Sequence, residues 1–412
     1  MTAVADGSLL TRRQELTAVS MLSLGFGLVG IDRFLISTLF PVIAADLHLS
    51  YSDIGAITGA LAVAWGISAL FMGNLSDRIG RRRVLSVSLI AFSLLIGASG
   101  LAAGLLSLIL VRIVMGFADG AYTPVSIAAT MAASAPQRRG FNIGIQQMMM
   151  PLFGLGLAPL FVAGALRYLE WRYIFLVFVL PGLLLSLGMW KIMPANVQDP
   201  RVGSRFGTDW RTALSYSNVR VAALLMLCWL TILITTSAFM PNYLVDHHHI
   251  PLALMSDIMS AIGLGATVGT LLLPWASDKF GRKATMGLSS LGALASLILL
   301  ANTGGNAVLL FAFLFLVHFF NNALITLTVG PLCSEAVPAA LMATASGLVI
   351  AVGELFGGGL MPFIAGHVAQ SFGIDHILWL PIAGAVAGFL LCLAIKNVVR
   401  PELSLWGFIQ HE

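Results

Sequence analysis

The sequence predicts an all-α membrane protein whose twelve transmembrane helices form two pseudo-symmetric six-helix bundles. Charged residues make up 10% of the 412-residue chain and hydrophobic residues 58%, whereas a soluble domain carries about 25% charged residues. Twelve apolar stretches are each long enough to supply the roughly 20 helical residues that cross a bilayer. A motif that recurs at almost half the chain length indicates that one set of six helices duplicates the other.

Hydropathy, together with the polar and Gly- or Pro-bearing breaks, places the helices along the chain. The first six are expected at 17–39, 54–74, 84–103, 105–131, 141–166 and 171–192. The second six are expected at 219–243, 255–276, 284–301, 307–331, 342–369 and 376–395. A polar stretch separates the two sets, so we expect an N-terminal bundle at 1–193, a cytoplasmic linker at 194–218 and a C-terminal bundle at 219–412.

Two pairs of matching segments are the evidence for the duplication. G-N-L-S-D-R-I-G-R-R-R begins at Gly73 and P-W-A-S-D-K-F-G-R-K begins at Pro274, with an offset of 201 residues. P-L-F-G-L-G-L-A-P-L from Pro151 and E-L-F-G-G-G-L-M-P-F from Glu354 match at an offset of 203. Two bundles that face each other across a central cavity are the architecture of secondary transporters.

The basic residues predict the orientation of the chain. With both termini in the cytoplasm, 18 of the 22 Lys and Arg residues lie on the cytoplasmic side and only Arg167 and Arg172 lie outside, as positive-inside insertion requires. The basic pI of about 9.1 is therefore a topology signal, and no nucleic-acid partner is expected. We expect a multi-pass protein of the cell membrane, in contact with lipid and monomeric.

The repeated loop motif predicts a gate. An aspartate at a helix end and arginines after a tight glycine turn can pair with neighbouring helices in one conformation and separate in another. If these residues served only positive-inside insertion, neither the aspartate nor the glycine would be needed. The candidate gating residues are Gly73, Asp77, Gly80, Arg81, Asp278, Gly281 and Arg282.

These loops resemble the signature loop of the major facilitator superfamily, which lies between the second and third helices and recurs between the eighth and ninth. R-x-x-x-G from Arg112 to Gly116 resembles a second motif of that family. The resemblance covers the whole chain. It implies that the loop network holds the cytoplasmic gate shut in the outward-open state.

Five charged residues fall inside predicted helices: Asp32, Arg33, Arg112, Asp119 and Glu354. A charge at the membrane centre costs about 2.5–3.5 kcal/mol on insertion scales, so such residues normally face a cavity or a partner. Seven residues separate Arg112 from Asp119, which places both on one helix face. The side chains of Asp32 and Arg33 are about 100° apart around the helix axis, so they point in different directions.

The segment I-D-R, the pattern R-x-x-x-G-x-x-D-G from Arg112 to Gly120 and the run W-R-Y-I-F-L-V-F-V-L-P-G from Trp171 to Gly182 resemble the anion:cation symporter family. The resemblance implies an organic anion carried with protons. Arg33 and Arg112 would bind the substrate carboxylate. Asp32 and Asp119 would exchange the coupling proton, although family members often carry a glutamate in place of Asp119.

Other polar residues inside helices are weaker candidates. Glu354 stands where the first repeat has a proline and is added to the proton-coupling group. Side chains that could contact substrate hydroxyls, or could instead join helices, are Tyr122, Gln146, Gln147 and Asn321. A further alternative is that the buried charges form a static ion pair that packs the first helix against the fourth.

The predicted function is a secondary active transporter that imports a small organic anion, such as a sugar acid or an aromatic acid, by proton symport and alternating access. The alternative is a proton-driven antiporter that exports drugs or metabolites, but only Pro151 and Gly154 fit the fifth-helix pattern of such exporters. No nucleophile-base constellation or metal set indicates an enzyme. Apart from H⁺ as the coupling ion, no cofactor is expected.

Overall fold

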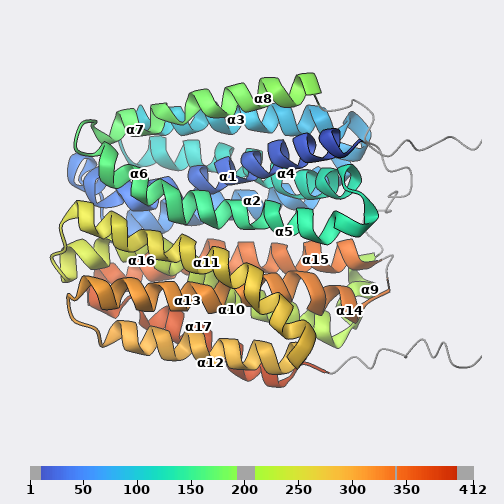
Figure 1. Cartoon of the computed structure of the whole chain (residues 1–412). Helices are drawn as coiled ribbons and strands as arrows, with labels where there is room; N and C mark the ends of the chain where they lie inside the picture. The colour runs from blue at the N-terminus through green and yellow to red at the C-terminus, as the bar shows by residue number, and fades with distance from the viewer. Residues whose placement is uncertain (1–10, 193–208, 339–340, 397–412) are drawn as a thin grey trace, which may run out of the picture.

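The computed structural model describes residues 11–192, 209–338 and 341–396. It confirms the all-helical membrane fold: within these ranges there is no strand, and twelve helical stretches are long and apolar enough to span a bilayer. Figure 1 shows the first six spans, coloured blue to green, lying against the last six, coloured yellow to red. This is the arrangement of two bundles that the duplication predicts.

The N-terminal half contributes six spans, and its fifth and sixth spans are each made of consecutive segments. These elements are α1 (Arg12–Leu47), α2 (Tyr51–Ile79), α3 (Arg81–Gly100), α4 (Leu105–Ala133), η1 (Pro136–Arg138), α5 (Arg139–Pro151), η2 (Leu152–Leu157), α6 (Ala158–Ala165), α7 (Trp171–Val177) and α8 (Val179–Ile192).

The C-terminal half contributes the other six spans, and π-helical segments interrupt or extend three of them. These elements are α9 (Asp209–Ser215), α10 (Ser217–Asn242), η3 (Tyr243–His247), α11 (Leu252–Phe280), α12 (Arg282–Ala301), α13 (Ala307–Leu327), η4 (Thr328–Leu332), α14 (Cys333–Ala336), α15 (Met342–Val352), η6 (Gly353–Leu360), α16 (Met361–Phe372), η7 (Ile374–His376) and α17 (Trp379–Leu393).

The helices extend beyond the apolar stretches that predicted them. α1 starts at Arg12 because Thr11 and Gln14 form a capping box, and it continues past the expected end at residue 39 to Leu47. Hydropathy finds the part of a helix that lies in hydrocarbon and misses polar turns at its ends. Most of the expected linker, at 194–208, lies outside the described residues, and its last residues form α9 and the start of α10.

The second pair of matching segments forms the same local structure twice. η2 in the fifth span and η6 in the eleventh are both π-helical, a form that occurs mostly as short bulges at functional sites. Gly154 of η2 packs on the Gly30 carbonyl, and Gly357 of η6 packs on the Leu227 carbonyl; an added Cβ would lie 2.3 Å and 2.5 Å from these oxygens. The duplication therefore preserves a close helix contact in each half.

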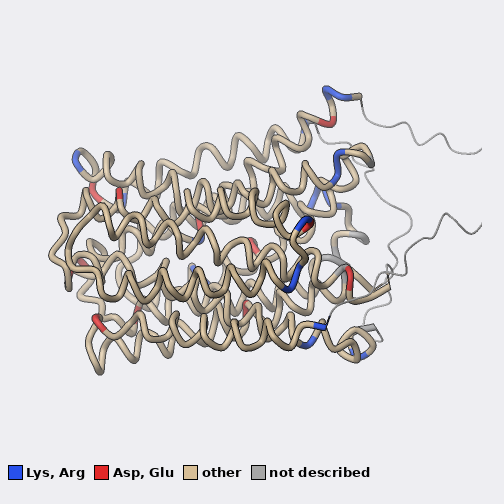
Figure 2. The backbone as a smooth tube through the Cα atoms, turned by 60° about the horizontal axis from the view of Figure 1, so that its bottom comes forward, with Lys and Arg blue, Asp and Glu red and all other residues tan. Residues whose placement is uncertain are grey.

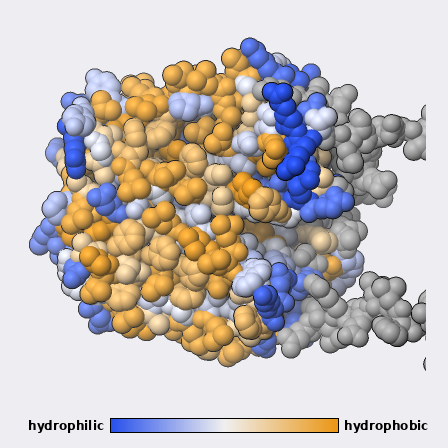
Figure 3. Space-filling view, viewed as in Figure 1, coloured by the Kyte–Doolittle hydropathy of each residue, from blue (hydrophilic) through white to orange (hydrophobic). Residues whose placement is uncertain are grey.

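The two ends of the bundle differ in charge. One end, called the basic end here, holds the α2–α3 and α11–α12 turns, and Figure 2 shows Lys and Arg concentrated there. Gly80 and Gly281 make these turns with φ of 97° and 88°, a conformation that favours glycine. An apolar band separates the basic end from the opposite end (Figure 3), as expected for a surface that faces lipid.

The two halves meet tightly at the opposite end. A Cβ on Gly55 of α2 would lie 2.2 Å from the Pro362 carbonyl oxygen of α16, and one on Gly366 would lie 2.9 Å from the Tyr51 carbonyl oxygen. The Tyr51 hydroxyl also donates to Asp246 across the interface at 2.8 Å. Backbones that approach this closely leave no room for a solute to pass.

Candidate functional site

A bidentate ion pair joins the two halves near the middle of the bundle. Arg33 of α1 donates from Nη1 to Glu354 Oε1 at 3.0 Å and from Nη2 to Oε2 at 2.7 Å. Both residues are buried, with 7% and 6% of their surface exposed. Charge-assisted, two-point bonds of this kind are among the strongest polar contacts in proteins.

Aromatic rings surround the same guanidinium. The Arg33 Cζ atom lies 4.5 Å from the centre of the Trp65 ring and 5.7 Å from that of Phe34. The face of an aromatic ring attracts a cation, and the attraction grows where water is excluded. Trp65 and Phe34 therefore help to hold a positive charge away from water and from lipid.

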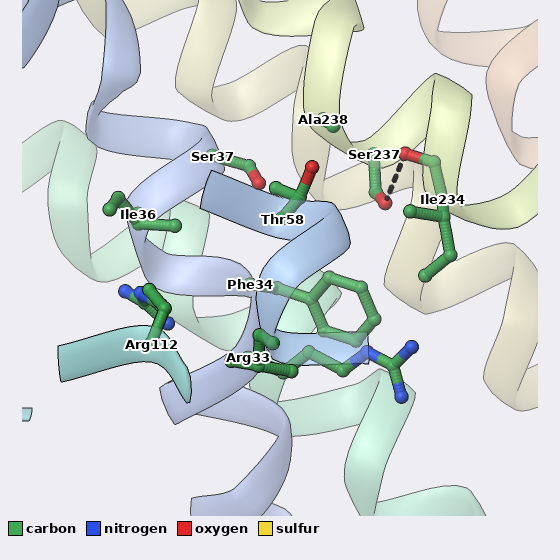
Figure 4. Close-up of a pocket in the computed structure, with 10 residues that line it drawn as sticks. Arg33, Phe34, Ile36, Ser37, Thr58, Arg112, Ile234, Ser237 and Ala238 are labelled. Carbon is green, nitrogen blue, oxygen red and sulfur yellow. Dashed lines mark hydrogen bonds between the residues drawn. The ribbon is translucent and has the colours of Figure 1, made fainter. Parts of the chain in front are cut away.

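Two cavities lie against Arg33. The larger, of about 130 Å³, lies between the halves, and Arg33 and Glu354 line it together. The smaller, of about 10 Å³, has room for about one water molecule, and Arg33, Arg112, Ser37, Thr58 and Ser237 are among the residues that line it. Figure 4 shows the smaller cavity, with the two serines and Thr58 on one side of Arg33.

The two arginines have separate surroundings. Figure 4 shows the Arg33 side chain extending away from Arg112. Arg112 Nη1 donates to the backbone oxygen of Asp32 at 2.7 Å, so Arg112 packs α4 against α1 within the N-terminal half. The structure thus brings only Arg33 to the larger cavity, while Arg112 reaches the smaller one.

Asp32, Asp119 and Arg112 form a buried cluster. Each is no more than 1% exposed, and the two carboxyl groups are within hydrogen-bonding reach of each other. Within the described part of the chain, no N–H or O–H donor reaches any of their four oxygens. Because a carboxylate only accepts hydrogen bonds, the two groups can bond to each other only when they share a proton.

The remaining candidates divide into one cavity residue and three that join helices. Gln147 lines the larger cavity. The Tyr122 hydroxyl donates to the Leu22 carbonyl, Gln146 donates to Ser126, and Asn321 donates to the Trp229 carbonyl. Each of these three bonds lies within one half, so the three side chains act as contacts between helices.

The comparison with protein families agrees with this geometry. The sequence pattern described as the Major Facilitator Superfamily matches residues 22–355 and 234–406. The chain belongs to that superfamily. It is a transporter and not an enzyme.

Two relatives of this superfamily transporter come from Escherichia coli (strain K12). A 3-(3-hydroxy-phenyl)propionate transporter is 29% identical over 340 residues, covering 79% of this chain and 80% of the relative. A probable L-galactonate transporter is 26% identical over 350 residues, covering 75% of each. A crystal structure of a bacterial homologue of the human lysosomal transporter Spinster, in an inward-facing and unoccupied conformation, matches with a TM-score of 0.78. It shares 17% identity and covers 94% and 98% of the two chains, which shows the shared fold.

The signature loops of the superfamily sit at the basic end. Arg282 pairs with Asp278 at 2.5 Å and with Glu335 at 3.3 Å, and it also donates to Ser277. In the first copy, Arg81 is buried with Nη1 at 3.5 Å from the Ala128 carbonyl oxygen. Gly73 and Asp77 lie on α2. Their side chains are outside the described part of the structure. The predicted pairing of loop arginines with neighbouring helices is therefore present at Arg282.

Several residues in and around the site were not found from the sequence. Trp65, Thr270 and Thr326 resemble ordinary residues of apolar helices, and no local pattern distinguishes them. Trp65 is 2% exposed and packs on Arg33, while the two threonines line the larger cavity. Only the packing of several helices brings these residues together.

Proposed function

We propose that this protein imports a small organic anion together with protons, by alternating access of its two bundles. The observation that carries the proposal is the Arg33 guanidinium, which lies on a cavity between the halves and already holds a carboxylate, that of Glu354. A substrate carboxylate can make the same two bonds. Relatives named as transporters of 3-(3-hydroxy-phenyl)propionate, hexuronate and L-galactonate support an acidic cargo.

Glu354 couples the anion to a proton in this proposal. An ionised Glu354 occupies Arg33 and competes with the substrate. When Glu354 takes up a proton, its carboxyl group loses the charge that holds the guanidinium, and the substrate carboxylate takes its place. Anion and proton then bind cooperatively, because each favours the state of Glu354 that admits the other.

Asp32 and Asp119 supply a second proton site. In this proposal their carboxyl groups share a proton beside the positive charge of Arg112. Release of that proton on one side of the membrane and its recovery on the other would link the cluster to the transport cycle. This role is separate from substrate binding, since none of Asp32, Arg112 and Asp119 lines the larger cavity.

The charge distribution supports the direction of transport. The basic end would face the cytoplasm by the positive-inside rule, with both termini there. The opposite end is closed by Gly55 and Gly366, so the present conformation corresponds to one that would deliver cargo inward. A proton gradient directed into the cell would then drive accumulation.

The test compares wild-type protein with Glu354→Gln in proteoliposomes. In the wild type, the Glu354 carboxylate competes with 3-phenylpropanoate or D-galactonate, whichever binds, for Arg33. Glutamine keeps the shape of glutamate and carries no charge, so the variant should bind the acid with a lower apparent Kd than the wild type. Glu170→Gln, at an exposed position, is the matched control and should behave as the wild type.

A thermal-shift measurement must first show that Glu354→Gln is folded. The proposed competition would be overturned if the folded variant bound the acid no more tightly than the wild type. If an imposed pH gradient did not change the uptake of either acid by the wild type, the proposal of proton symport would be wrong.

A further inference from the structure

We infer that the cargo is an aromatic monocarboxylic acid with at most one or two polar substituents, and not a polyhydroxylated sugar acid. The inference rests on the proposed function and specifies its substrate class. It follows from the composition, the hydrogen-bonding capacity and the size of the larger cavity.

The walls of the larger cavity are mostly apolar. Eight of its fourteen lining side chains are hydrocarbon, thioether or proline, contributed by both halves, and they include Phe34, Leu155, Leu230 and Ile325. A bound solute therefore places most of its surface against groups that offer no hydrogen bond. Ligand sites of this kind select by apolar contact and use a few polar groups to fix the orientation.

Four neutral polar side chains line the larger cavity, and two of them already use a donor within their own helix. Thr326 donates to the Asn322 carbonyl at 2.9 Å, and Asn322 Nδ2 donates to the His318 carbonyl at 3.3 Å, so both donate to their own helix. Gln147 and Thr270 also line the cavity. Neither side chain has a hydrogen-bond partner among residues 11–192, 209–338 and 341–396. These two side chains suit one or two substituents.

A sugar acid needs many more hydrogen-bond partners than these side chains offer. Each hydroxyl group presents one donor and two acceptor sites, and burial of a hydroxyl without partners is costly. A hexonate with five hydroxyl groups would leave most of them against leucine, methionine and proline. An aryl ring leaves no hydrogen-bonding group unpaired there, because its surface is apolar.

The size of the cavity agrees with one ring. Its volume of about 130 Å³ is close to that of an apolar protein cavity of about 150 Å³ that holds benzene. The carboxylate of the acid would replace Glu354 on Arg33, whose guanidinium lies near the rings of Trp65 and Phe34. A single ring with a short acid chain thus satisfies both the charge and the apolar wall.

The first experiment measures proton-driven uptake of three labelled acids into proteoliposomes: 3-phenylpropanoate, its ring-hydroxylated form 3-(3-hydroxyphenyl)propanoate, and D-galactonate. Both aryl acids should accumulate, and D-galactonate should not compete at a hundredfold excess. The neutral alcohol 3-phenylpropanol should not compete either, because it lacks the group that Arg33 binds. Uptake of D-galactonate without uptake of the aryl acids would overturn this inference and leave the proposed function standing. Failure of all three acids would overturn both.

The second experiment tests whether Gln147 and Thr270 bind the ring hydroxyl of the acid. The double variant Gln147→Leu/Thr270→Val should raise the KM for the ring-hydroxylated acid about threefold to tenfold, the usual effect of losing one neutral hydrogen bond. Thr267→Val is the matched control, since the Thr267 hydroxyl bonds to the Gly263 carbonyl of its own helix and does not line the cavity. An unchanged KM in the double variant would show that neither Gln147 nor Thr270 bonds to the ring hydroxyl.

Discussion

At the scale of single residues, two neighbours in α1 have different roles. Arg33 reaches Glu354 in the other half, whereas Asp32 stays among Arg112 and Asp119 in its own half. The rotation of about 100° per residue in a helix makes this division unavoidable. One helix turn therefore carries both a member of the ion pair that spans the halves and a member of the buried cluster that lies within one half.

The proposed proton site gives a prediction for Asp119→Asn. Asparagine can still donate a hydrogen bond to Asp32 but cannot release a proton. We expect exchange of labelled for unlabelled acid across the membrane to continue within about threefold of the wild-type rate. Net uptake driven by a pH gradient should fall at least tenfold, because each net cycle requires proton release.

The matched control is Asp46→Asn, which removes a half-exposed carboxylate that pairs with Arg172 at the opposite end. It should leave both exchange and net uptake unchanged. If Asp119→Asn accumulated acid as well as the wild type does, the Asp32–Asp119 pair would have no part in coupling.

At the scale of helices, glycines set the distances between spans. Gly265 and Gly269 on α11 face the carbonyls of Phe315 and Phe319 on α13; an added Cβ would lie 2.2 Å and 1.9 Å from these oxygens. Small residues one turn apart allow two helix backbones to touch. The many glycines of the sequence are therefore structural where they lie on such faces.

This geometry predicts opposite effects for two substitutions. Gly269→Ala should destabilise the protein by about 1–3 kcal/mol, because the new methyl group meets a backbone that cannot move aside. Gly164→Ala on α6, where an added Cβ has no atom within 4 Å, should be neutral or stabilise by up to about 1 kcal/mol. Thermal unfolding in detergent measures both, and equal shifts in Tm would show that the α11–α13 contact does not limit stability.

At the scale of the whole molecule, the halves are closed at the opposite end and tied in the middle by Arg33 and Glu354. The closing contacts are between glycines and backbone carbonyls, which a small rotation of one bundle can separate without breaking a core. The central ion pair is different, because burial makes an unpaired charge costly. In the proposed cycle, release of this ion pair by a proton and a substrate anion would control when the bundles move.

A larger side chain in the closing contact should shift this equilibrium. Gly55→Leu cannot coexist with the Pro362 carbonyl in its present position, so the open state at the opposite end should gain population about tenfold or more. In a Thr58→Cys background, a membrane-impermeant thiol reagent applied from the opposite end should react correspondingly faster, since Thr58 lines the small cavity.

Gly104→Leu serves as the control, because it also lies at the opposite end and an added Cβ there has no neighbour within 4 Å. The three native cysteines are buried, so the parent protein gives the background rate. Equal labelling in the two glycine variants would count against closure through Gly55.

The sequence by itself determined the twelve spans, the duplication, the glycine turns at Gly80 and Gly281 and the five charged residues inside the helices. These features depend on composition and spacing along the chain, because transfer into lipid is governed by the residues of each segment. Only the tertiary structure decided that Arg33 pairs with Glu354, 321 positions away, that Arg112 holds the Asp32 carbonyl, and that an apolar cavity lies beside the ion pair. Such contacts arise from the packing of several helices, and the relative rotation of those helices is encoded in no single one of them.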